Sequence, residues 1–567
     1  MSWIFGYNGI ITETIQKKFD KFDTLPEKKI LNERLILLAG GNHKTLFYSD
    51  SKNWIVSGVG IIADDSQIRL MSRDDWDKSF ANRLLPELEG HFLFIYWNDE
   101  EIIFQSDQAG LRTIYFYQTE TGIFFSTKLK LLSSLLPKTE LDFYTFGSRW
   151  KLFNQFSHDS IIKDVKKLPP AGIAQIKNNK LYLKQNKVSS VISTKSPADL
   201  LQVIEKHLKI IIPDELNLTL GLSGGLDSRF LFALMLKSKR DFLIHTFGSE
   251  TDPDVLIAKR AAGVIRKNIN FIQTSESISS DFLSKLLEYA SVNELIEPVS
   301  SFQKLIVFEN EYFRDKVIVD GALAEFARRQ FLNRLLFKGK KLLMNKDSEG
   351  VISHLTLAKP EIFRKEYVLQ MQEGIKQQLS DIFASHNNFI EYQPEQFLDQ
   401  LIYDYRIPNY FGPEQSRLDE IVLSFMIFAQ KNIFEICKHI PLQSKVNSRI
   451  FYNYLRENYP MLAKIPLIKG GISYQFGSST IRSFIVTKLK KYFSNDFSSG
   501  ARIIFLNGLK EYCYEILSER EIKNYPPYDS DKIIKIRDGF YEGNLKLAND
   551  LDWLLSFELF RKGLKID

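Results

Sequence analysis

The sequence predicts an α/β protein built from two unequal parts. Residues 1–187 contain short β-rich runs separated by polar or glycine-containing turns, as expected for a sandwich of antiparallel sheets. From residue 199 onwards, helical patterns alternate with short apolar strands, which is typical of a doubly wound parallel sheet. The polar stretch 188–198, which contains Pro197, is interpreted as a linker. The chain is mostly helical beyond residue 350, so we expect the second domain, 199–567, to end in a helical extension.

The individual elements follow from local patterns of β-branched, aromatic and apolar residues. The strands expected in the first part are 54–62, 92–97, 102–104, 113–117 and 123–127, and the segments 162–172 and 180–182 end this part. In the second part we expect strands at 216–222, 243–247 and 317–319 and helices at 230–237, 254–264, 279–288 and 551–564.

The overall composition excludes several classes of protein. At 567 residues, two to four domains are expected, and contents of 44% hydrophobic and 25% charged residues are ordinary for a globular protein. The net charge of +6 is spread along the chain without a basic run, so we expect no nucleic-acid partner. No apolar run approaches the length of a transmembrane helix, so membrane insertion is not expected. Cys437 and Cys513 offer neither metal spacing nor a disulfide framework, which favours a cytoplasmic location.

The stretch most specific for chemistry is Leu222-Ser223-Gly224-Gly225-Leu226-Asp227-Ser228, between the strand 216–222 and the helix 230–237. Two adjacent glycines allow successive amide groups to face one concavity, which opens onto a helix N-terminus that favours phosphate. Asp227 is placed to hold the Mg²⁺ that accompanies phosphates. The stretch lacks the Gly-Lys-Ser/Thr of a Walker loop and the third glycine of a dinucleotide fingerprint. We interpret it as the pyrophosphate loop of an ATP pyrophosphatase and expect Mg-ATP to bind there.

The order of these segments resembles the asparagine synthetase family, in which an N-terminal nucleophile (Ntn) glutaminase domain precedes an ATP pyrophosphatase-type synthetase domain. The matching motifs are Met1–Gly6, Glu89–Phe92, Ser106–Arg112, Phe125–Thr127, Lys167–Pro170, the Ser223 loop, Thr246–Ser249 and the helix with Asp254, Ala258 and Ala262. The resemblance implies an Ntn-like fold for residues 1–187. It also implies that Thr246, Phe247 and Gly248 take part in binding ATP.

The first domain departs from the family at its glutaminase residues. The family uses a thiol at position 2, whereas this chain has Ser2, a poorer nucleophile that nevertheless serves other Ntn hydrolases. The acidic residue that would anchor the glutamine amino group is replaced by His91, and the family's Arg-Gly-Pro-Asp segment is absent from the sequence. We therefore expect a structural domain rather than a glutaminase.

A second acidic motif is expected after the strand 317–319. The family has Ser-Gly-Glu-Gly-Ser/Ala-Asp-Glu there, and this chain has Val319-Asp320-Gly321-Ala322-Leu323-Ala324-Glu325-Phe326. Asp320 or Glu325 could complete a magnesium shell with Asp227, and the alternative is a capped helix start with a surface glutamate. Arg328 and Arg329 could meet a phosphate or a substrate carboxylate, or they could lie on a solvated face.

Amide ligases that form acyl adenylates also need a cation for the second half of the reaction. In the family this is a lysine followed by a turn. Lys469 before Gly470-Gly471 fits best and Lys464 is the alternative, although either could be an ordinary surface lysine. The segment 419–432 lies where the family has a helix with an arginine, and it contains none.

These features favour an ATP-dependent ligase that activates a carboxylate as an acyl adenylate, releases pyrophosphate and joins the acyl group to an amine or ammonia. Similar proteins without the N-terminal cysteine include β-lactam synthetases and lasso peptide macrolactam cyclases, so the carboxylate could belong to a small molecule or a peptide. A second hypothesis is asparagine synthesis from aspartate, fed by ammonia or glutamine. A third is a degenerate protein that binds nucleotide or a partner without turnover. A homodimer is left open.

Overall fold

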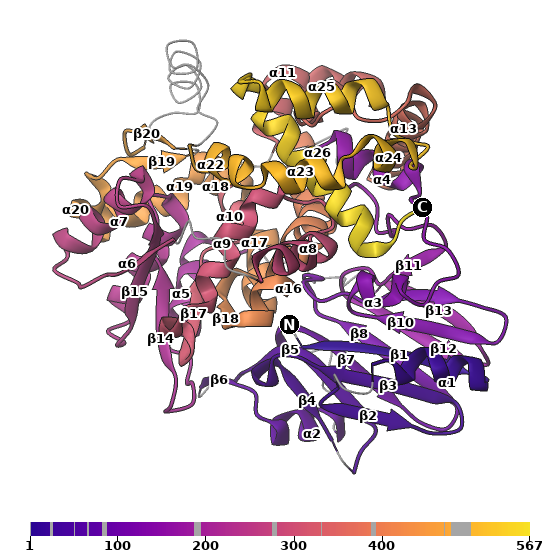
Figure 1. Cartoon of the computed structure of the whole chain (residues 1–567). Helices are drawn as coiled ribbons and strands as arrows, with labels where there is room; N and C mark the ends of the chain where they lie inside the picture. Colours follow the sequence, from indigo (N-terminus) through magenta and orange to yellow (C-terminus); the bar gives the residue numbers. More distant parts are fainter. Residues whose placement is uncertain are drawn as a thin grey trace.

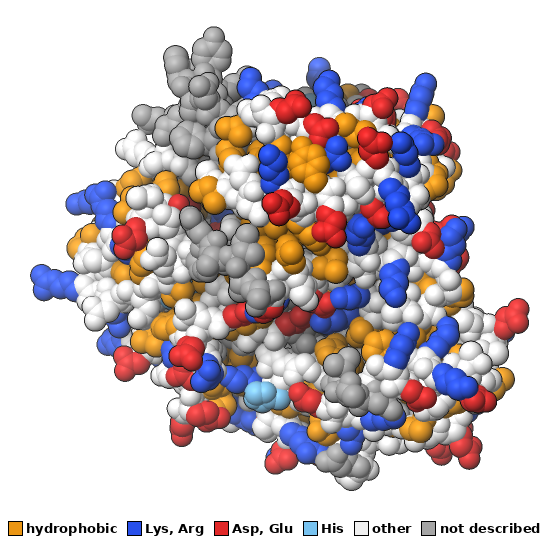
Figure 2. Space-filling model, in the orientation of Figure 1, with side chains coloured by type: hydrophobic (Ala, Val, Ile, Leu, Met, Phe, Trp, Pro, Cys, Tyr) orange, Lys and Arg blue, Asp and Glu red, His pale blue; other side chains and the backbone are white. Residues whose placement is uncertain are grey.

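The structure is a computed structural model that describes residues 2–22, 26–49, 51–64, 67–81, 88–185, 194–274, 281–329, 332–386, 393–469, 471–477 and 500–567. It is a mixed α/β protein with two antiparallel sheets, a five-stranded parallel sheet and many helices. In Figure 1 the antiparallel sheets (indigo to purple) occupy one side and the parallel sheet (magenta) the other, with C-terminal helices (orange to yellow) above. Acidic and basic side chains are mixed over the face in Figure 2.

The first part is a sandwich of two antiparallel sheets. One sheet has the order β11 (Val165–Lys167), β9 (Tyr115–Gln118), β10 (Gly122–Ser126), β1 (Trp3–Gly9), β3 (Leu35–Gly40) and β2 (Lys28–Leu31). The other has the order β13 (Lys180–Gln185), β12 (Gly172–Lys177), β8 (Glu101–Ser106), β7 (Glu89–Trp97), β5 (Trp54–Ala63) and β4 (Leu46–Tyr48), and β6 (Ile68–Leu70) pairs with β5. A shared core that includes Leu37 of one sheet and Leu93 of the other confirms the predicted layers.

Short helices complete the sandwich. They are α1 (Glu13–Asp20), the 3₁₀ turn η1 (His43–Thr45), α2 (Arg73–Ala81), α3 (Leu129–Ser133) and α4 (Phe143–Lys151). The predicted linker 188–198 lies in part outside the described residues. Its last two residues already belong to α5 (Pro197–His207), which Ser196 caps by accepting the N–H of Asp199.

The parallel sheet of the second part has the order β16 (Asn270–Gln273), β15 (Leu243–Gly248), β14 (Asn217–Gly221), β17 (Lys316–Asp320) and β18 (Leu423–Met426). The helices between its first four strands are α6 (Leu226–Lys237), α7 (Pro253–Val264), α8 (Phe282–Val292) and α9 (Phe302–Ile306), with the 3₁₀ turns η3 (Val299–Ser301), η4 (Val307–Glu309) and η5 (Glu311–Phe313). The chain therefore changes direction across the sheet between β14 and β17. In open α/β sheets, ligands bind at this switch point, beside the carboxyl ends of the strands.

The predicted strands of this sheet are confirmed, and its edge strand β18 lies in a segment for which the sequence analysis predicted no strand. The segment 419–432, where the family has a helix with an arginine, contains the end of α16 (Gly412–Ile421), the strand β18, the 3₁₀ turn η7 (Ile427–Ala429) and the start of α17 (Lys431–His439). Its residues Leu423–Met426 are all buried and pair with β17. Burial on both faces explains why three of these four residues are apolar, and the buried Ser424 donates a hydrogen bond to Asp419 Oδ1.

The rest of the chain is mainly helical, as predicted. It contains α10 (Glu325–Arg328), α11 (Asn333–Met344), α12 (Ser348–Leu355), α13 (Lys365–Ser385), α15 (Pro394–Leu401), the π-helix η6 (Ile402–Phe411), α18 (Leu442–Lys445), η8 (Val446–Ser448), α19 (Arg449–Asn458) and α20 (Pro460–Ala463). A hairpin of β19 (Leu467–Lys469) and β20 (Ile472–Tyr474) precedes α22 (Gly500–Gly508), α23 (Lys510–Ile516), α24 (Glu519–Lys523), α25 (Ser530–Tyr541), η9 (Leu545–Leu547) and α26 (Ala548–Leu564).

The C-terminal helix joins the two parts. Leu555 of α26 belongs to the same hydrophobic core as Leu286 of α8 and Phe5 of β1. Within the described residues, no helix is long and apolar enough to cross a membrane.

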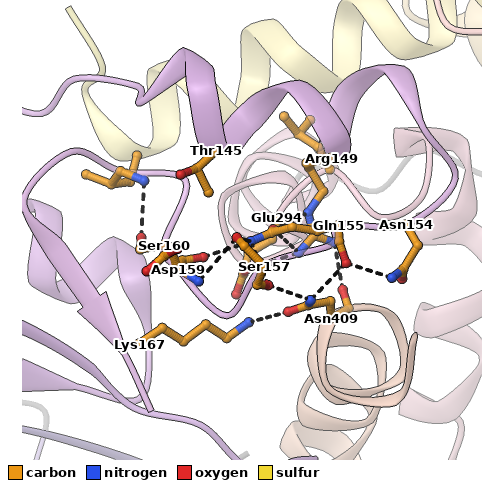
Figure 3. Close-up of polar contacts among 12 residues, drawn as sticks. Thr145, Arg149, Asn154, Gln155, Ser157, Asp159, Ser160, Lys167, Glu294 and Asn409 are labelled. Carbon is orange, nitrogen blue, oxygen red and sulfur yellow. Dashed lines mark hydrogen bonds and ion pairs between the residues drawn. The ribbon is translucent and has the colours of Figure 1, made fainter. Parts of the chain in front are cut away.

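A buried polar network forms another contact between the parts (Figure 3). Arg149 of α4 donates to the Asn409 carbonyl of η6 at 2.7 Å and to Gln155 Oε1 at 2.9 Å. Lys167 of β11 donates to Asn409 Oδ1 at 3.2 Å, and Arg149 faces Glu294 at 3.9 Å. Burial lowers the pKa of Lys167 to about 8. The network connects the edge of the sandwich to the helices beside the parallel sheet.

Candidate active site

The Ser223 loop lies where β14 gives way to α6, at the switch point of the parallel sheet. Its own side chains hold the loop amides: the Ser223 N–H donates to Ser228 Oγ at 3.1 Å and the Gly225 N–H to Ser223 Oγ at 3.1 Å. The Gly224 N–H donates to Asp254 Oδ1 at 3.0 Å. The N-cap of α6 is Gly225, so no side chain caps this helix. The first-turn amides of α6 are therefore the groups best placed to meet a phosphate.

Two glycines allow other segments to approach this loop closely. A Cβ at Gly224 would come within 2.6 Å of the Ile468 side chain on β19. A Cβ at Gly321, which follows β17, would come within 3.2 Å of Asp227 Cβ. Three segments that are distant in sequence thus meet at the loop: the start of α6, the end of β17 and the hairpin strand β19.

Asp227 is the centre of a charged cluster. Its Oδ2 atom is 2.8 Å from Arg328 Nη2, and its buried Oδ1 atom has no hydrogen-bond partner in the structure. Burial raises the pKa of the Asp227 carboxyl to about 6; Arg328 and Lys469 oppose this rise, while Glu325 and Asp320 add to it. The structure therefore brings together Asp227, Asp320, Glu325 and Lys469, which the sequence analysis selected separately.

The second acidic motif supplies Asp320 and Glu325 from different elements. Asp320 ends β17 and accepts the Ala322 N–H at 2.8 Å, and burial raises the pKa of its carboxyl. It does not cap α10, because the N-cap of that helix is Ala324. Glu325 begins α10 and lies 3.5 Å from Arg406 Nε. The simple alternative of a capped helix start therefore does not describe Asp320.

We tested whether these residues fit a magnesium ion. Among the described residues, no three His, Cys, Asp or Glu side chains are close enough to form a metal cage by themselves. Mg²⁺ accompanying a nucleotide needs only one or two carboxylates, since phosphate oxygens and water complete its octahedron. Asp227 has a carboxylate oxygen without a partner, and the charge of Asp320 acts on it. The donor set fits a nucleotide-bound Mg²⁺.

The two candidate lysines differ in position. Lys469 ends β19, and its charge acts on Asp227. The preceding residue, Ile468, donates its N–H to the Gly224 carbonyl at 2.9 Å, which ties this strand to the loop. Lys464, at the end of α20, is absent from the charges that act on Asp227. Both lysines are exposed, so they differ in their link to Asp227 and not in accessibility.

Sequence reasoning missed Arg229, which fixes the hairpin strand. Its buried guanidinium donates to the carbonyls of Ile465 at 2.7 Å and Pro466 at 2.8 Å and also reaches the Gly224 carbonyl at 3.4 Å. The signal was a basic residue, directly after the loop, in an otherwise apolar helix.

The remaining candidates lie at the same edge of the sheet or turn away from it. Thr246, Phe247 and Gly248 form the carboxyl end of β15, next to β14. Gly248 has a φ of +143°, and a Cβ there would come within 2.6 Å of Asp252 Oδ2. Arg329 instead points into the protein and pairs with Asp399 at 3.1 Å. Of the two arginines, only Arg328 faces the loop.

Ser2 and His91, which replace two glutaminase residues of the family, are both buried and contact other protein groups. Ser2 is fully buried, and its hydroxyl donates to the Thr45 carbonyl at 2.7 Å and lies 2.8 Å from Ser57 Oγ. His91 Nε2 lies 3.2 Å from Asp419 Oδ2, which also pairs with Arg112. Burial lowers the pKa of His91 to about 3, so this imidazole is neutral.

Comparison with known proteins gives only weak likenesses. No family model matches the chain, and no curated protein matches it. One similar solved structure is an allosteric regulatory enzyme of purine biosynthesis, with 11% identity, a TM-score of 0.20, and coverage of 50% of this chain and 61% of that one. Another is the glutamine phosphoribosylpyrophosphate amidotransferase of B. subtilis, with 10% identity, a TM-score of 0.21, and coverage of 58% and 77%. At these scores the likenesses carry no argument, so the function must be argued from the site.

Proposed function

We propose that this protein is an ATP-dependent carbon–nitrogen ligase that activates a carboxylate as an acyl adenylate and then joins it to an amine or ammonia. The observation that carries the proposal is the Ser223–Ser228 turn at the switch point of the sheet, with Asp227, Arg328 and Lys469 around it. A helix N-terminus without a capping side chain, two carboxylates and two cations suit a nucleotide triphosphate with its magnesium ion.

In this proposal each group of residues has a separate role in the reaction. The first-turn amides of α6 bind the phosphates, and Arg328 moves from Asp227 to a phosphate oxygen when ATP arrives. Asp227 and Asp320 would hold Mg²⁺, and the ion would supply positive charge that offsets the charge of the phosphates and of the departing pyrophosphate. The substrate carboxylate attacks the α-phosphate to give the acyl adenylate. Lys469 then stabilises the negative charge that develops as the amine attacks the adenylate and AMP departs.

A second candidate is a protein that binds nucleotide or a partner without turnover. It is favoured by the 2.8 Å pair between Arg328 and Asp227, which occupies one carboxylate oxygen, and by loop amides that are already hydrogen-bonded.

Mg-ATP binding measured by calorimetry, with pyrophosphate exchange over a panel of small carboxylates and peptides, separates the two. We expect Mg-ATP to bind and at least one carboxylate to support exchange. Asp227→Asn should reduce exchange at least about a hundredfold, because it removes a metal ligand that supports several kcal/mol of charge stabilisation. Glu311→Gln, whose side chain is 89% exposed on the protein surface, is the matched control. Binding without exchange would favour the second candidate. No binding at millimolar ATP would contradict the ligase and leave a protein that binds a partner.

A further inference from the structure

A second charged cluster lies directly beside the Asp227 site. Glu325, on the same short helix as Arg328, is 3.5 Å from Arg406, whose guanidinium stacks over the Tyr410 ring at 3.8 Å. The Tyr410 hydroxyl in turn lies 3.3 Å from Glu297 Oε1. A continuous series of contacts therefore runs from the proposed ATP site to Glu297.

In this cluster four carboxyl groups lie among three cations; the carboxyl groups are those of Glu297, Glu325, Glu414 and Asp320, and the cations are Arg406, Arg417 and Lys304. Arg417 Nη2 lies 4.0 Å from Glu297 Oε2. Glu414 makes no ion pair or hydrogen bond within the part of the chain that the structure describes. Burial raises the pKa of Glu414 to about 8; the charges of Glu297 and Asp320 add to this rise, and those of Arg417 and Lys304 oppose it. One of the two carboxyl groups therefore keeps its proton at neutral pH.

Two deeply buried side chains in the same cluster also lack partners. Among the residues that the structure describes, the Tyr289 hydroxyl and Arg417 Nη1 have no hydrogen bond, and both residues are only 4% exposed. The Arg417 guanidinium lies over the Tyr289 ring at 5.1 Å, and the charges of Arg417, Glu297 and Glu414 all act on the Tyr289 hydroxyl. Buried polar atoms normally have partners, so these atoms point to a polar ligand.

The chemistry of the cluster selects a cation. The carboxylates of Glu297 and Glu414 and the hydroxyl of Tyr289 can accept hydrogen bonds from an ammonium or guanidinium group. A bound cation would also allow Glu414 to lose its proton, because a nearby positive charge favours the ionised carboxylate. Glu297 retains 20% side-chain exposure, so the cluster is accessible from solvent.

We propose that Glu297 and Glu414 bind the ammonium or guanidinium group of the amine substrate, next to the site where the amide bond forms. The proposal rests on the proposed ligase function. A protonated amine cannot attack an adenylate, so the anchored group is a second basic group, and the accepted amine is a diamine or a molecule with a basic side chain.

Calorimetric titration of the full chain with putrescine at pH 7 tests this proposal. Putrescine should bind and release close to one proton, measured as a dependence of the binding heat on the ionisation heat of the buffer. Glu414→Gln and Glu297→Gln should each weaken binding at least about tenfold, and Glu414→Gln should also abolish the proton release. The neutral analogue n-butanol should not bind. Glu311→Gln serves as the matched control, and thermal melting verifies that each variant is folded.

Putrescine binding that is unaffected by either substitution, or that releases no proton, would overturn the proposal. Tyr410→Phe, which removes only the hydroxyl that contacts Glu297, provides a milder second variant and should also weaken binding. The two proposals fail separately. Specific putrescine binding without Mg-ATP binding would retain the cation site and remove the ligase, whereas Mg-ATP binding without putrescine binding would do the reverse.

Discussion

Two serine-containing clusters, one in each part of the chain, show how similar residues can have opposite roles. Around Ser2, the hydroxyls of Thr45 and Ser57 and the backbone form a closed set of hydrogen bonds, and Ser2 has no exposed surface. Around Ser223, the loop is partly exposed and faces charged groups. A reactant could reach the second cluster but not the first.

The polar groups near the two clusters differ in the same way. His91 Nε2 and the Arg112 guanidinium both lie at Asp419 Oδ2, and Asp227 pairs with Arg328. Among the described residues, both groups keep buried polar atoms without a hydrogen bond, for example His91 Nδ1 and Asp227 Oδ1. They differ in exposure: the Asp227 side chain is 27% exposed, whereas the side chains of His91 and Asp419 have no exposed surface. A charged group that solvent can reach and whose pKa is shifted is typical of a site that binds a ligand.

The largest expected effect is on stability, through the ion pair that joins Arg112 of the first part to Asp419 of the second. Asp419→Ala should lower the free energy of unfolding by about 3–5 kcal/mol, because it leaves the Arg112 guanidinium buried without its carboxylate. Urea denaturation measures the loss. The exposed pair Glu13–Lys17 is the control, and Glu13→Ala should cost about 0.5 kcal/mol or less. Equal losses in the two variants would show that the buried pair between Asp419 and Arg112 does not stabilise the fold more than an exposed ion pair does.

The next effect is on the rate of amide formation at the site around the Ser223 loop, and not on stability. Lys469→Ala should slow amide formation by two to three powers of ten, or about 2.7–4 kcal/mol, by analogy with a lost oxyanion donor. Pyrophosphate exchange should persist, since the lysine acts after adenylation. Lys464→Ala is the control, and Lys469→Gln should not restore the rate. A slow Lys464→Ala enzyme with a normal Lys469→Ala enzyme would reverse the assignment.

A smaller effect should appear in the pH dependence of stability. The pKa of Asp227 is about 6 in the folded protein and 3.8 by reference, so the folded state binds the proton more tightly. Stability contributed by this group is present below pH 4 and is lost as the pH rises to 6. Asp227→Asn should therefore stabilise the ligand-free protein by about 1–3 kcal/mol at pH 7 and by little at pH 4. Thermal melts at both pH values test this sign.

The smallest effect belongs to Ser2. Ser2→Ala removes hydrogen bonds within a fully buried cluster and should cost about 1 kcal/mol of unfolding free energy without changing pyrophosphate exchange. Wild-type protein given glutamine and ATP should release no glutamate above background. Release that disappears in Ser2→Ala would make Ser2 an Ntn nucleophile and end the contrast between the two regions.

The sequence predicted the sandwich, the parallel sheet and the Ser223 loop because local patterns determine these features. It could not predict β18, since a short and mostly apolar segment such as Leu423–Ala429 suits a buried strand or a buried helix equally well. The partner of His91 was also hidden, because Asp419 lies 328 residues further along the chain and only the fold brings them together.

Within the candidate site, residue types were easier to predict than their pairings. Asp320, Glu325 and Lys469 were selected from motifs, and the structure places their charges around Asp227. The cluster of Glu297, Glu414 and Arg417 carried no motif and became visible only through unpaired buried atoms. Such a cluster depends on three-dimensional proximity between α16 and the loop after α8, which sequence spacing does not encode.

The contacts of Arg229 determine which residues must be transferred together when the hairpin is grafted between proteins. Because its guanidinium holds the carbonyls of Ile465 and Pro466, and Ile468 bonds to Gly224, the segment that carries Lys469 is registered against the loop by contacts outside the segment itself. A chimera that imports residues 461–474 from another protein would keep the lysine but lose its alignment unless position 229 and the loop are transferred with it. The start of α6 and the hairpin should therefore be grafted together.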